Sequence, residues 1–579
     1  MKYFFAFLSI AGLLYSDEDV YPPKPLHKDE EVQYNTEYPE DASPLSVERK
    51  VLIGRGKGLI IVDADEKLDI NQASLDLYLA KGVVFSGIDI PGNSERLREC
   101  LADLVVDQQI TTATIEEIKR EIHRHYQSEG YPFVQVFLPQ QDVTDSVLQM
   151  VVLESRLGKV VARENRWYKS AMLEKAISVK PDEIINLNWI MRDLNFLNRS
   201  PFMRVDAIYT PGCEPNTTDI ILKVKDICPF RIYGGVDNAG LESTNRGRGY
   251  TGIEYGKMWG LNHTLKLGFV SSLDSSRFRG YTAEYIALLS WHHILTVLGG
   301  YSHVQHVKLD FPFMKNHGNS YQGSVRYAIP IRPIGRLNQE VNFGADWKRT
   351  NNTIEFSALF ERFGKNANLT QAVVGYYANL EVPLFRLDWS ADLYWSPGRM
   401  IADQTNEDYD SLRPGAVNKY VYGAASIRLL QWMPKNFSIL FWLRGQWASN
   451  NLLPSEQIGI GGFSTVRGYE ERQLSTDDGF ILNTEIRTPF LPCFPKSWGR
   501  KEYSEGLQFL VFLDYGYGRN HTPIPEEGKS QFLLGAGPGA RYNIDPWIYA
   551  RIDWGFKWHS SDLFAFGGSM IHFGINISL

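Results

Sequence analysis

A single cation lies inside a glycine-rich segment near the end of the chain. The segment Gly459–Tyr469 reads Gly-Ile-Gly-Gly-Phe-Ser-Thr-Val-Arg-Gly-Tyr and ends in the tetrapeptide Val466-Arg467-Gly468-Tyr469. It belongs to a long connection, residues 449–478, between two segments in which apolar and polar residues alternate. An arginine that folds into a protein interior needs a carboxylate partner, because an unpaired buried charge is costly. The pattern therefore predicts an ion pair that fixes the position of a loop.

Two carboxylates downstream are candidate partners for Arg467. Glu485 shares one face of its predicted strand with Asn483 and Arg487, and Asp514 lies on the polar face of the strand after it. The polar faces of membrane-barrel strands point into the lumen. We therefore expect Asp514 to be the first partner and Glu485 the second, with an exposed, solvated loop arginine as the alternative.

Four further charges lie on predicted lumenal faces near the end of the chain. We expect them to form a solvated lumenal lattice rather than a specific site. They are Arg541, Arg551, Asp553 and Lys557.

Patterns typical of enzymes are missing from the sequence. There is no His-Glu-x-x-His, no Gly-x-Ser-x-Gly and no cysteine–histidine spacing that suits zinc. Gly54–Gly58 does not have the Gly-x-x-x-x-Gly-Lys-Ser/Thr pattern of a phosphate-binding loop, so a turn is expected there. The net charge of −7 gives no basic excess for a nucleic-acid partner. The sequence predicts a protein that is not an enzyme, with no cofactor and no metal.

From Phe230 onward the sequence alternates with period two. Its segments run for about 10–13 residues, which suits tilted strands that span a bilayer and exceeds the 5–6 residues typical of soluble sandwiches. No run of about 18 apolar residues follows the N-terminus, so helical spans are excluded. The pattern predicts an antiparallel transmembrane β-barrel over residues 229–579. Sixteen or seventeen segments can be counted because 338–382 divides ambiguously, and an even number, sixteen, is expected.

The residues before the barrel predict three kinds of segment. Residues 1–16 have the basic start and short apolar core of a secretory signal, and 17–80 have the acidic, proline-bearing composition of a flexible leader, with 66–80 a candidate plug helix. Two β-α-α-β-β modules follow, at 81–157 and 158–228. Between Cys213 and Cys228 no disulfide is expected, because the two flank a predicted hairpin unevenly.

Several segments resemble one superfamily. Gly459–Tyr469 resembles the sixth extracellular loop of the BamA/TpsB outer-membrane insertases and transporters, and Ile481–Pro489 and Phe512–Gly516 resemble that superfamily's paired strand motifs. Gly130–Asp142 followed by Leu148–Glu154 is similar to the polypeptide-transport-associated (POTRA) domain of two-partner secretion transporters of the ShlB/FhaC type. Two modules also match that TpsB branch, since the BamA insertases usually carry five.

The resemblance covers roughly residues 80–579 and implies a function. It implies a transporter in the outer membrane of a Gram-negative-type bacterium, with POTRA domains in the periplasm. Such a protein captures an unfolded TpsA-type exoprotein, a large β-helical adhesin or haemolysin, and exports it through the barrel without nucleotide hydrolysis. The alternatives are an insertase for outer-membrane barrels and a passive porin with incidental modules.

The resemblance also implies partners and binding strands. The partners are the exoprotein, outer-membrane lipid and the barrel-assembly machinery that inserts a monomeric barrel, although Leu579 stands where an aromatic residue is usual. Exposed strand edges bind extended chains by β-augmentation. The expected client-binding residues of the first module are Phe133, Val134, Gln135, Val136, Phe137, Leu138, Val147, Leu148, Val151 and Leu153.

Overall fold

The computed structural model describes residues 50–63, 82–141, 143, 146–304, 314–356, 362–493, 504–523, 528–559 and 567–579. The predicted signal sequence at 1–16 and the candidate plug helix at 66–80 lie outside the described residues. The described chain divides into two compact units, the modules up to Ile227 and the barrel from Cys228, and each is described by itself.

The first module is a four-stranded sheet with two helices. Its sheet has the order β3-β2-β6-β5. Every third or fourth residue of each helix is apolar and buried against the sheet, as the spacing predicted. The elements are β2 (Gly58–Val62), β3 (Val83–Ser86), α3 (Ser94–Val105), α4 (Thr112–Ser128), β5 (Val134–Phe137) and β6 (Val147–Glu154).

The first module begins earlier than the sequence predicted. Strand β2 lies between β3 and β6, parallel to both, and a short strand β1 (Val51–Ile53) pairs with β4 (Ile110–Thr111). All five residues of β2 are buried. A central strand covered on both faces shows no alternation, so its apolar run carries no period-two signal. The predicted end of the leader at residue 80 is therefore wrong.

The second module repeats the predicted order of elements. Its sheet has the order β7-β9-β8, and the chain runs through β7 (Arg156–Arg163), α5 (Ser170–Lys175), α6 (Leu187–Leu197), β8 (Met203–Pro211) and β9 (Thr217–Asp226). Cys213 and Cys228 are both free, as expected.

No helix in the part of the chain that the structure describes is long and apolar enough to cross a bilayer.

The two modules are joined by a short, bonded connection. Only Ser155 separates β6 from β7, and its backbone amide donates to the Phe133 carbonyl at 2.9 Å. The Leu187 amide at the start of α6 donates to the Gly130 carbonyl at 2.8 Å. The Phe133 ring packs on the Tyr209 ring with centroids 4.7 Å apart. These contacts make the two modules one packed unit.

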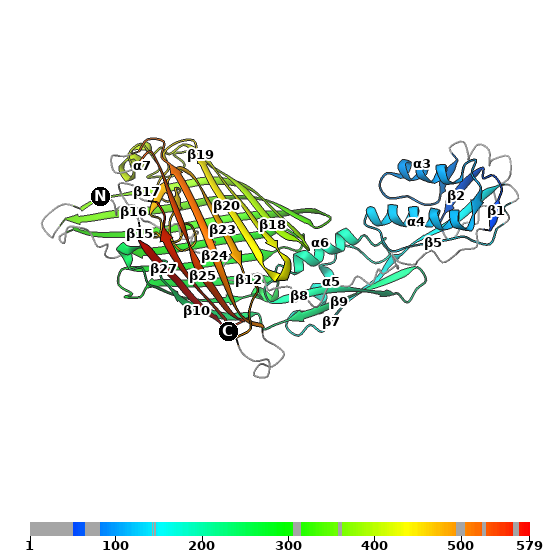
Figure 1. Ribbon diagram of the computed structural model, residues 1–579, viewed down its shortest axis with the longest axis horizontal. Helices are drawn as coiled ribbons and strands as arrows, with labels where there is room; N and C mark the ends of the chain where they lie inside the picture. Colours follow the sequence, from blue (N-terminus) through cyan, green and yellow to red (C-terminus); the bar gives the residue numbers. More distant parts are fainter. Residues whose placement is uncertain are drawn as a thin grey trace. The chain divides into compact units, whose positions relative to one another are not determined.

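The C-terminal unit is a closed barrel of sixteen antiparallel strands, which confirms the predicted number (Figure 1). β10 pairs with both β11 and β27, so the first and last strands close it. The ambiguous region 338–382 forms most of two long strands. The strands are β10 (Phe230–Asp237), β11 (Arg248–Tyr255), β12 (His263–Ser272), β13 (Phe278–Leu288), β14 (Ile294–Val304), β15 (Met314–Ile334), β16 (Leu337–Phe356), β17 (Arg362–Val382), β18 (Phe385–Ser396), β19 (Tyr420–Trp432), β20 (Ser438–Ala448), β23 (Asp478–Arg487), β24 (Ser504–Arg519), β25 (Ser530–Asp545), β26 (Ile548–Lys557) and β27 (Ser569–Ser578).

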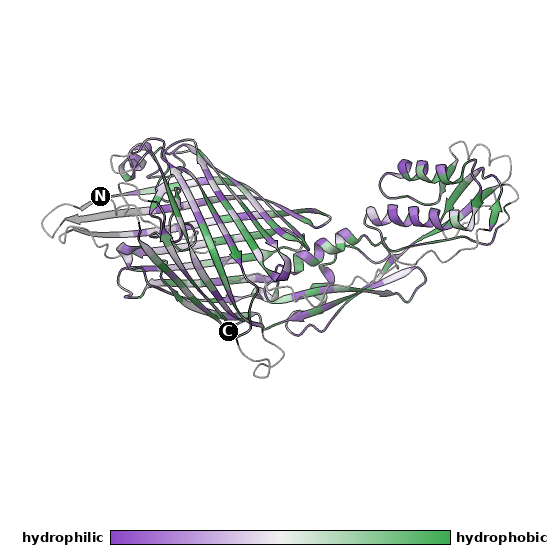
Figure 2. Ribbon diagram, in the orientation of Figure 1, coloured by the Kyte–Doolittle hydropathy of each residue, from purple (hydrophilic) through white to green (hydrophobic). Residues whose placement is uncertain are grey.

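The barrel wall has an apolar outside and a polar inside. On β27, Ile571 and Phe573 are 49% and 41% exposed, whereas His572 and Asn576 are buried. Figure 2 shows the same alternation of hydrophobic and hydrophilic residues along the barrel strands. Lipid therefore meets the apolar set, and the polar set faces the lumen.

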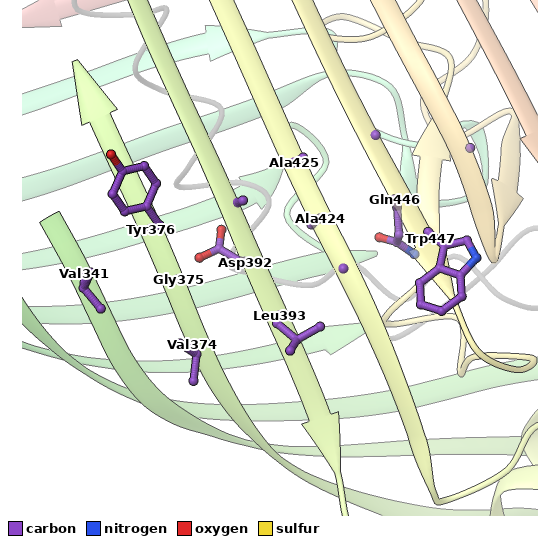
Figure 3. Close-up of a pocket in the computed structure, with 14 residues that line it drawn as sticks. Val341, Val374, Gly375, Tyr376, Asp392, Leu393, Ala424, Ala425, Gln446 and Trp447 are labelled. Carbon is purple, nitrogen blue, oxygen red and sulfur yellow. The ribbon is translucent and has the colours of Figure 1, made fainter. Parts of the chain in front are cut away.

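Small residues leave a depression of about 670 Å³ in the wall formed by β16–β20 and β23 (Figure 3). Its accessible lining is mostly apolar and includes the exposed side chains of Val374, Leu393 and Trp447. Gly423 and Gly445 are among the small residues that line it. The depression is a feature of the apolar wall and contains no cluster of charges.

The module joint yields a prediction. Gly130 has a φ of +91°, and a Cβ there would lie 2.3 Å from Asn188 Nδ2. Gly130→Ala should lower the free energy of unfolding of segment 50–227 by about 1–3 kcal/mol, measured in urea. Gly54→Ala is the control, because a Cβ there has no atom within 4 Å. Equal stability of the two variants would contradict the packed joint.

Candidate functional site

The connection 449–478 folds inward against the barrel wall. It carries a two-stranded hairpin of β21 (Ile458–Ile460) and β22 (Leu474–Thr476). Between them, Val466 and Tyr469 are fully buried and pack in one cluster with Ile481 of β23 and Leu533 of β25. This apolar contact holds the tip of the loop, with Arg467 between the two, inside the barrel.

The Arg467 side chain lies against the two carboxylates that the sequence indicated. Its Nε donates to Asp514 Oδ2 at 2.7 Å and its Nη2 to Asp514 Oδ1 at 2.9 Å, which forms a two-pronged pair. Its Nη1 donates to Glu485 Oε1 at 2.6 Å. The backbone amide of Arg467 also donates to Asp514 Oδ2, at 3.0 Å. Asp514 is thus the first partner and Glu485 the second, and the arginine is not a solvated loop residue.

An aromatic ring completes the surroundings of the guanidinium. The Arg467 guanidinium carbon lies 3.6 Å from the centroid of the Phe512 ring, two residues before Asp514 on the same face of β24. Only 3% of the side chain is exposed. A buried cation in this position is held by charge, hydrogen bonds and cation–π attraction together, and breaking one buried pair costs about 3–5 kcal/mol.

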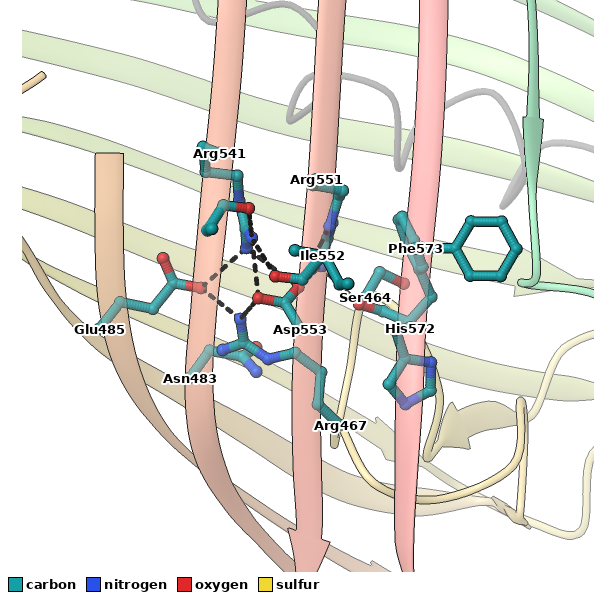
Figure 4. Close-up of polar contacts among 12 residues, drawn as sticks. Ser464, Arg467, Asn483, Glu485, Arg541, Arg551, Ile552, Asp553, His572 and Phe573 are labelled. Carbon is teal, nitrogen blue, oxygen red and sulfur yellow. Dashed lines mark hydrogen bonds and ion pairs between the residues drawn. The ribbon is translucent and has the colours of Figure 1, made fainter. Parts of the chain in front are cut away.

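Further charged residues surround Arg467 and its two carboxylate partners (Figure 4). Asp553 on β26 accepts from Arg541 Nη1 at 2.7 Å and from Arg551 Nη2 at 2.7 Å, and its Oδ1 lies 3.6 Å from Arg467 Nη1. Arg487 pairs with the other oxygen of Glu485. We call this group the loop-tip network; its members are Arg467, Glu485, Arg487, Asp514, Arg541, Arg551 and Asp553.

The expected solvated lattice at Arg541, Arg551 and Asp553 is wrong. All three are buried, because the loop fills the lumen beside them and excludes water. Arg551 Nη2 donates to the Phe463 carbonyl of the loop at 3.0 Å, and its guanidinium lies 3.8 Å from the Phe463 ring centroid. These residues therefore bind the loop as well as each other. Lys557 lies 5.4 Å from the Tyr469 ring.

Glycines allow the loop backbone to approach the wall. A Cβ at Gly555 of β26 would lie 2.3 Å from the Gly468 nitrogen, and a Cβ at Gly535 of β25 would lie 2.0 Å from the Arg467 carbonyl oxygen. Gly468 itself has a φ of +97°, a conformation that favours glycine. Its amide donates to His572 Nε2 on β27 at 3.0 Å. The glycine of the Val-Arg-Gly-Tyr tetrapeptide is therefore required for contact with two strands.

Other residues that hold the loop were not found from the sequence. Asn483 donates to Asp514 Oδ1 at 2.8 Å and also binds the Thr465 carbonyl, and Arg444 Nη2 donates to the Ser464 carbonyl at 2.7 Å. Tyr469, which the tetrapeptide already indicated, adds a hydrogen bond from its hydroxyl to the Leu534 carbonyl at 3.1 Å. Period-two alternation placed Asn483 on the correct face, but a side chain that binds a loop carbonyl has no sequence pattern of its own.

The predicted client-binding strands of the first module differ in their access to a partner. β5 pairs only with β6 and has a free edge among the described residues, and its Phe137 is 41% exposed. β6 lies between β2, which pairs with Val147–Val151, and β5, which pairs with Val151–Glu154, so it is not an edge strand of this sheet. An edge position is therefore wrong for Val147, Leu148, Val151 and Leu153. Phe133 lies in the module joint against Tyr209, and Leu138 packs on the first module's core.

The loop-tip network has the chemistry of a positioning device. Its arginines and carboxylates pair with each other, and no group of His, Cys, Asp and Glu in the described ranges is arranged to hold a metal ion. The apolar depression of Figure 3 lies in a wall outside the network. What the arrangement can do is hold the loop in the lumen and release it when the ion pairs break.

Comparison with known families gives a match over more than half of the chain. The model of the haemolysin secretion/activation protein family ShlB/FhaC/HecB matches residues 216–542. The chain belongs to this family. The ShlB-type POTRA model matches residues 78–155, so the first module is a POTRA domain. The protein is therefore an outer-membrane barrel protein of the ShlB/FhaC/HecB family with POTRA domains in the periplasm.

Curated relatives are 22–26% identical to this family member over the aligned residues. The heme/hemopexin transporter protein HuxB of Haemophilus influenzae strain 86-028NP is 24% identical over 77% of this chain and 78% of that protein. The outer membrane transporter CdiB of Dickeya dadantii is 26% identical over 73% of each. The hemolysin transporter protein ShlB of Serratia marcescens is 22% identical over 66% and 68%.

Solved structures show the same fold. CdiB from Escherichia coli superposes with a TM-score of 0.75 at 18% identity and covers 92% of both chains. CdiB from Acinetobacter baumannii gives a TM-score of 0.68 at 19% identity, over 92% and 91%.

The glycine contacts yield a prediction about the position of the loop. Gly555→Ala places a methyl group where the Gly468 amide lies, so the loop tip should leave the wall with no charge removed. The free energy that holds the loop tip against the wall should fall by about 1–3 kcal/mol. The measurement is amide exchange, which should become faster over residues 462–470. Gly445→Ala on β20 is the control, since its Cβ would meet its nearest atom at 3.7 Å. Unchanged exchange in Gly555→Ala would contradict the close approach.

Proposed function

We propose that this protein is the outer-membrane partner of a two-partner secretion pair. It receives an unfolded exoprotein in the periplasm through its POTRA domains and exports it through the barrel without nucleotide hydrolysis. The observation that carries the proposal is the charged loop tip, held inside a closed barrel by ion pairs of Arg467 with Asp514 and Glu485. The relatives' names, a heme/hemopexin transporter and a hemolysin transporter, support an exported partner.

The loop tip has to move before a polypeptide can pass. Val466, Arg467 and Tyr469 are buried between the hairpin and the wall, in space that an exported chain needs. Breaking one pair costs about 3–5 kcal/mol. The backbone hydrogen bonds of several bound client residues contribute a comparable stabilisation. Export then draws on binding of the client inside and on its folding outside. In this mechanism Arg467 is a reversible gate contact rather than a permanent strut.

Capture of the client falls to the free edge of the first POTRA sheet. β5 presents unpaired backbone groups on one side, and an extended client segment adds there as a further strand. Val134 and Val136 face the core, whereas Gln135 and Phe137 face outward and meet the client's side chains. The client is a large secreted protein rich in β-structure, which offers many such segments.

The gate mechanism predicts the effect of removing the loop cation. Arg467→Ala should abolish secretion of the exoprotein while the barrel stays in the outer membrane, because the loop loses its position and two carboxylates are left unpaired. The measurement is exoprotein in the culture medium, with heat-modifiable gel mobility as the check on the barrel. Arg386→Ala is the matched control, since this arginine pairs with Asp388 on β18. Normal secretion from Arg467→Ala would contradict the mechanism.

The capture step predicts a difference between two exposed edges. Phe137→Glu on β5 should lower secretion about tenfold, because it puts an unpaired charge where a client strand packs. Ile208→Glu on β8 of the second module, a side chain 46% exposed, should have a smaller effect. Secretion is measured at matched protein levels. A larger loss of secretion in Ile208→Glu than in Phe137→Glu would indicate that the client binds the second module instead.

A further inference from the structure

Another buried arginine lies at the extracellular end of the barrel, away from the loop tip. Arg413 follows helix α7 (Asn406–Leu412) in the loop between β18 and β19. Its side chain is 1% exposed. We propose that Arg413 is a positioning residue for export, which holds the base of the loop 449–478 as a separate contact from Arg467 at the tip. This inference rests on the proposed function.

The contacts of Arg413 reach two other loops. Its Nη1 donates to Asp477 Oδ1 at 2.6 Å and to the Leu452 carbonyl at 2.8 Å. Its Nη2 donates to Asp477 Oδ2 at 3.1 Å and to Asn520 Oδ1 at 3.2 Å. Leu452 and Asp477 lie at the two ends of the loop 449–478, and Asn520 begins the loop between β24 and β25. One guanidinium therefore binds three extracellular loops together.

Asp477, the partner of Arg413, also binds residues of the same two loops. It is completely buried, and its Oδ1 accepts from the Leu452 amide at 2.9 Å while its Oδ2 accepts from the His521 amide at 3.2 Å. Its own amide donates to Asn520 Oδ1 at 3.2 Å. The Asp477 carboxylate thus joins Leu452 near the start of the loop to Asp477 near its end, which fixes the width of the loop base. We call Arg413 and Asp477 the loop-base pair.

Helix α7 adds an apolar contact to the loop-base pair. Tyr409 is fully buried in a cluster with Leu452 and Leu453 of the loop and with Tyr420 and Tyr422 of β19. Its hydroxyl donates to the Asn368 carbonyl on β17 at 3.0 Å. The helix therefore folds onto the inner wall and packs against the loop that Arg413 binds.

The base and the tip of the loop depend on different residues. Arg467 contacts Asp514, Glu485, Asp553 and Phe512. Arg413 instead contacts Leu452, Asp477 and Asn520. The eleven residues from Arg467 to Asp477 include the strand β22, which pairs with β21 in the loop's own hairpin. A buried ion pair of this kind fixes one geometry more than it adds net stability. Two such pairs allow the tip to leave the wall while the base keeps the loop in register for its return.

Amide exchange in the full-length protein, reconstituted in lipid nanodiscs, separates the two contacts. Arg413→Ala and Asp477→Asn should each speed exchange by at least about tenfold over residues 406–413 and 449–457, with residues 462–470 unchanged. The double variant should exchange no faster than the faster single variant, because both changes remove the same pair. Arg399→Ala, an exposed arginine in the same loop, should leave all three segments unchanged. Where Arg413→Ala fails to form a heat-modifiable barrel, Arg413→Lys is measured instead. An intermediate increase in the exchange rate is expected, because the lysine ammonium keeps the charge but cannot make the two-pronged contact of the guanidinium.

Three results would overturn the inference. The first is unchanged exchange at the loop base in Arg413→Ala, or in Arg413→Lys where that variant is the one measured. The second is equal loss of protection at base and tip, which would make the two pairs one contact. The third is normal secretion from a variant whose loop base has lost protection, since export would then not depend on it. The exchange result does not depend on a client, so failure of the proposed function, seen as normal secretion from Arg467→Ala, is distinguishable from failure of this inference.

Discussion

The structure of the barrel interior depends on one buried cation. Arg467 joins a loop to three strands through Asp514, Glu485 and Asp553, and the glycines that face it allow the loop backbone to reach the wall. Removing water from these charges makes each pair costly to break singly. Because each partner also binds a second cation or amide, the loop has one well-defined position. The proposed gate needs such a position to which the loop returns.

Much of this site could be predicted from the sequence because a barrel strand has a strict period. Alternation put Glu485 and Asp514 on lumenal faces, and the resemblance of the loop to that of the BamA/TpsB superfamily implied an acidic partner for Arg467 on the inner wall. Sixteen strands followed from the number of alternating segments and the rule for even numbers. Alternation predicts which face of the wall a residue lies on, but it does not predict whether the side chain is exposed to water or buried. Arg541, Arg551 and Asp553 were placed on the correct face, and their burial follows from the folded loop, which no local pattern encodes.

Other features were missed because they depend on contacts distant in sequence. Strand β2 is central in its sheet, so both its faces are apolar and the period-two signal is absent. The order of strands in that sheet leaves β5 with a free edge and β6 without one, although both have suitable residues. Arg413 lies in an irregular loop, and its partner Asp477 is more than sixty residues away in sequence. Composition and spacing contain no information on that pairing.

The central claim is that the loop tip leaves the wall during export, and a reversible tether tests it most directly. A Cβ at Gly516 of β24 would lie 2.9 Å from Val466 Cγ2 but 2.3 Å from Ile460 Cγ2, so the tether is a disulfide between Val466→Cys and Gly516→Cys made in an Ile460→Ala background. With Cys100, Cys213, Cys228 and Cys493 replaced by serine, exoprotein secretion is measured in oxidising medium and again after reduction. We predict that the oxidised protein secretes nothing and that reduction restores secretion. Secretion at the same rate through the oxidised, tethered protein would contradict the account.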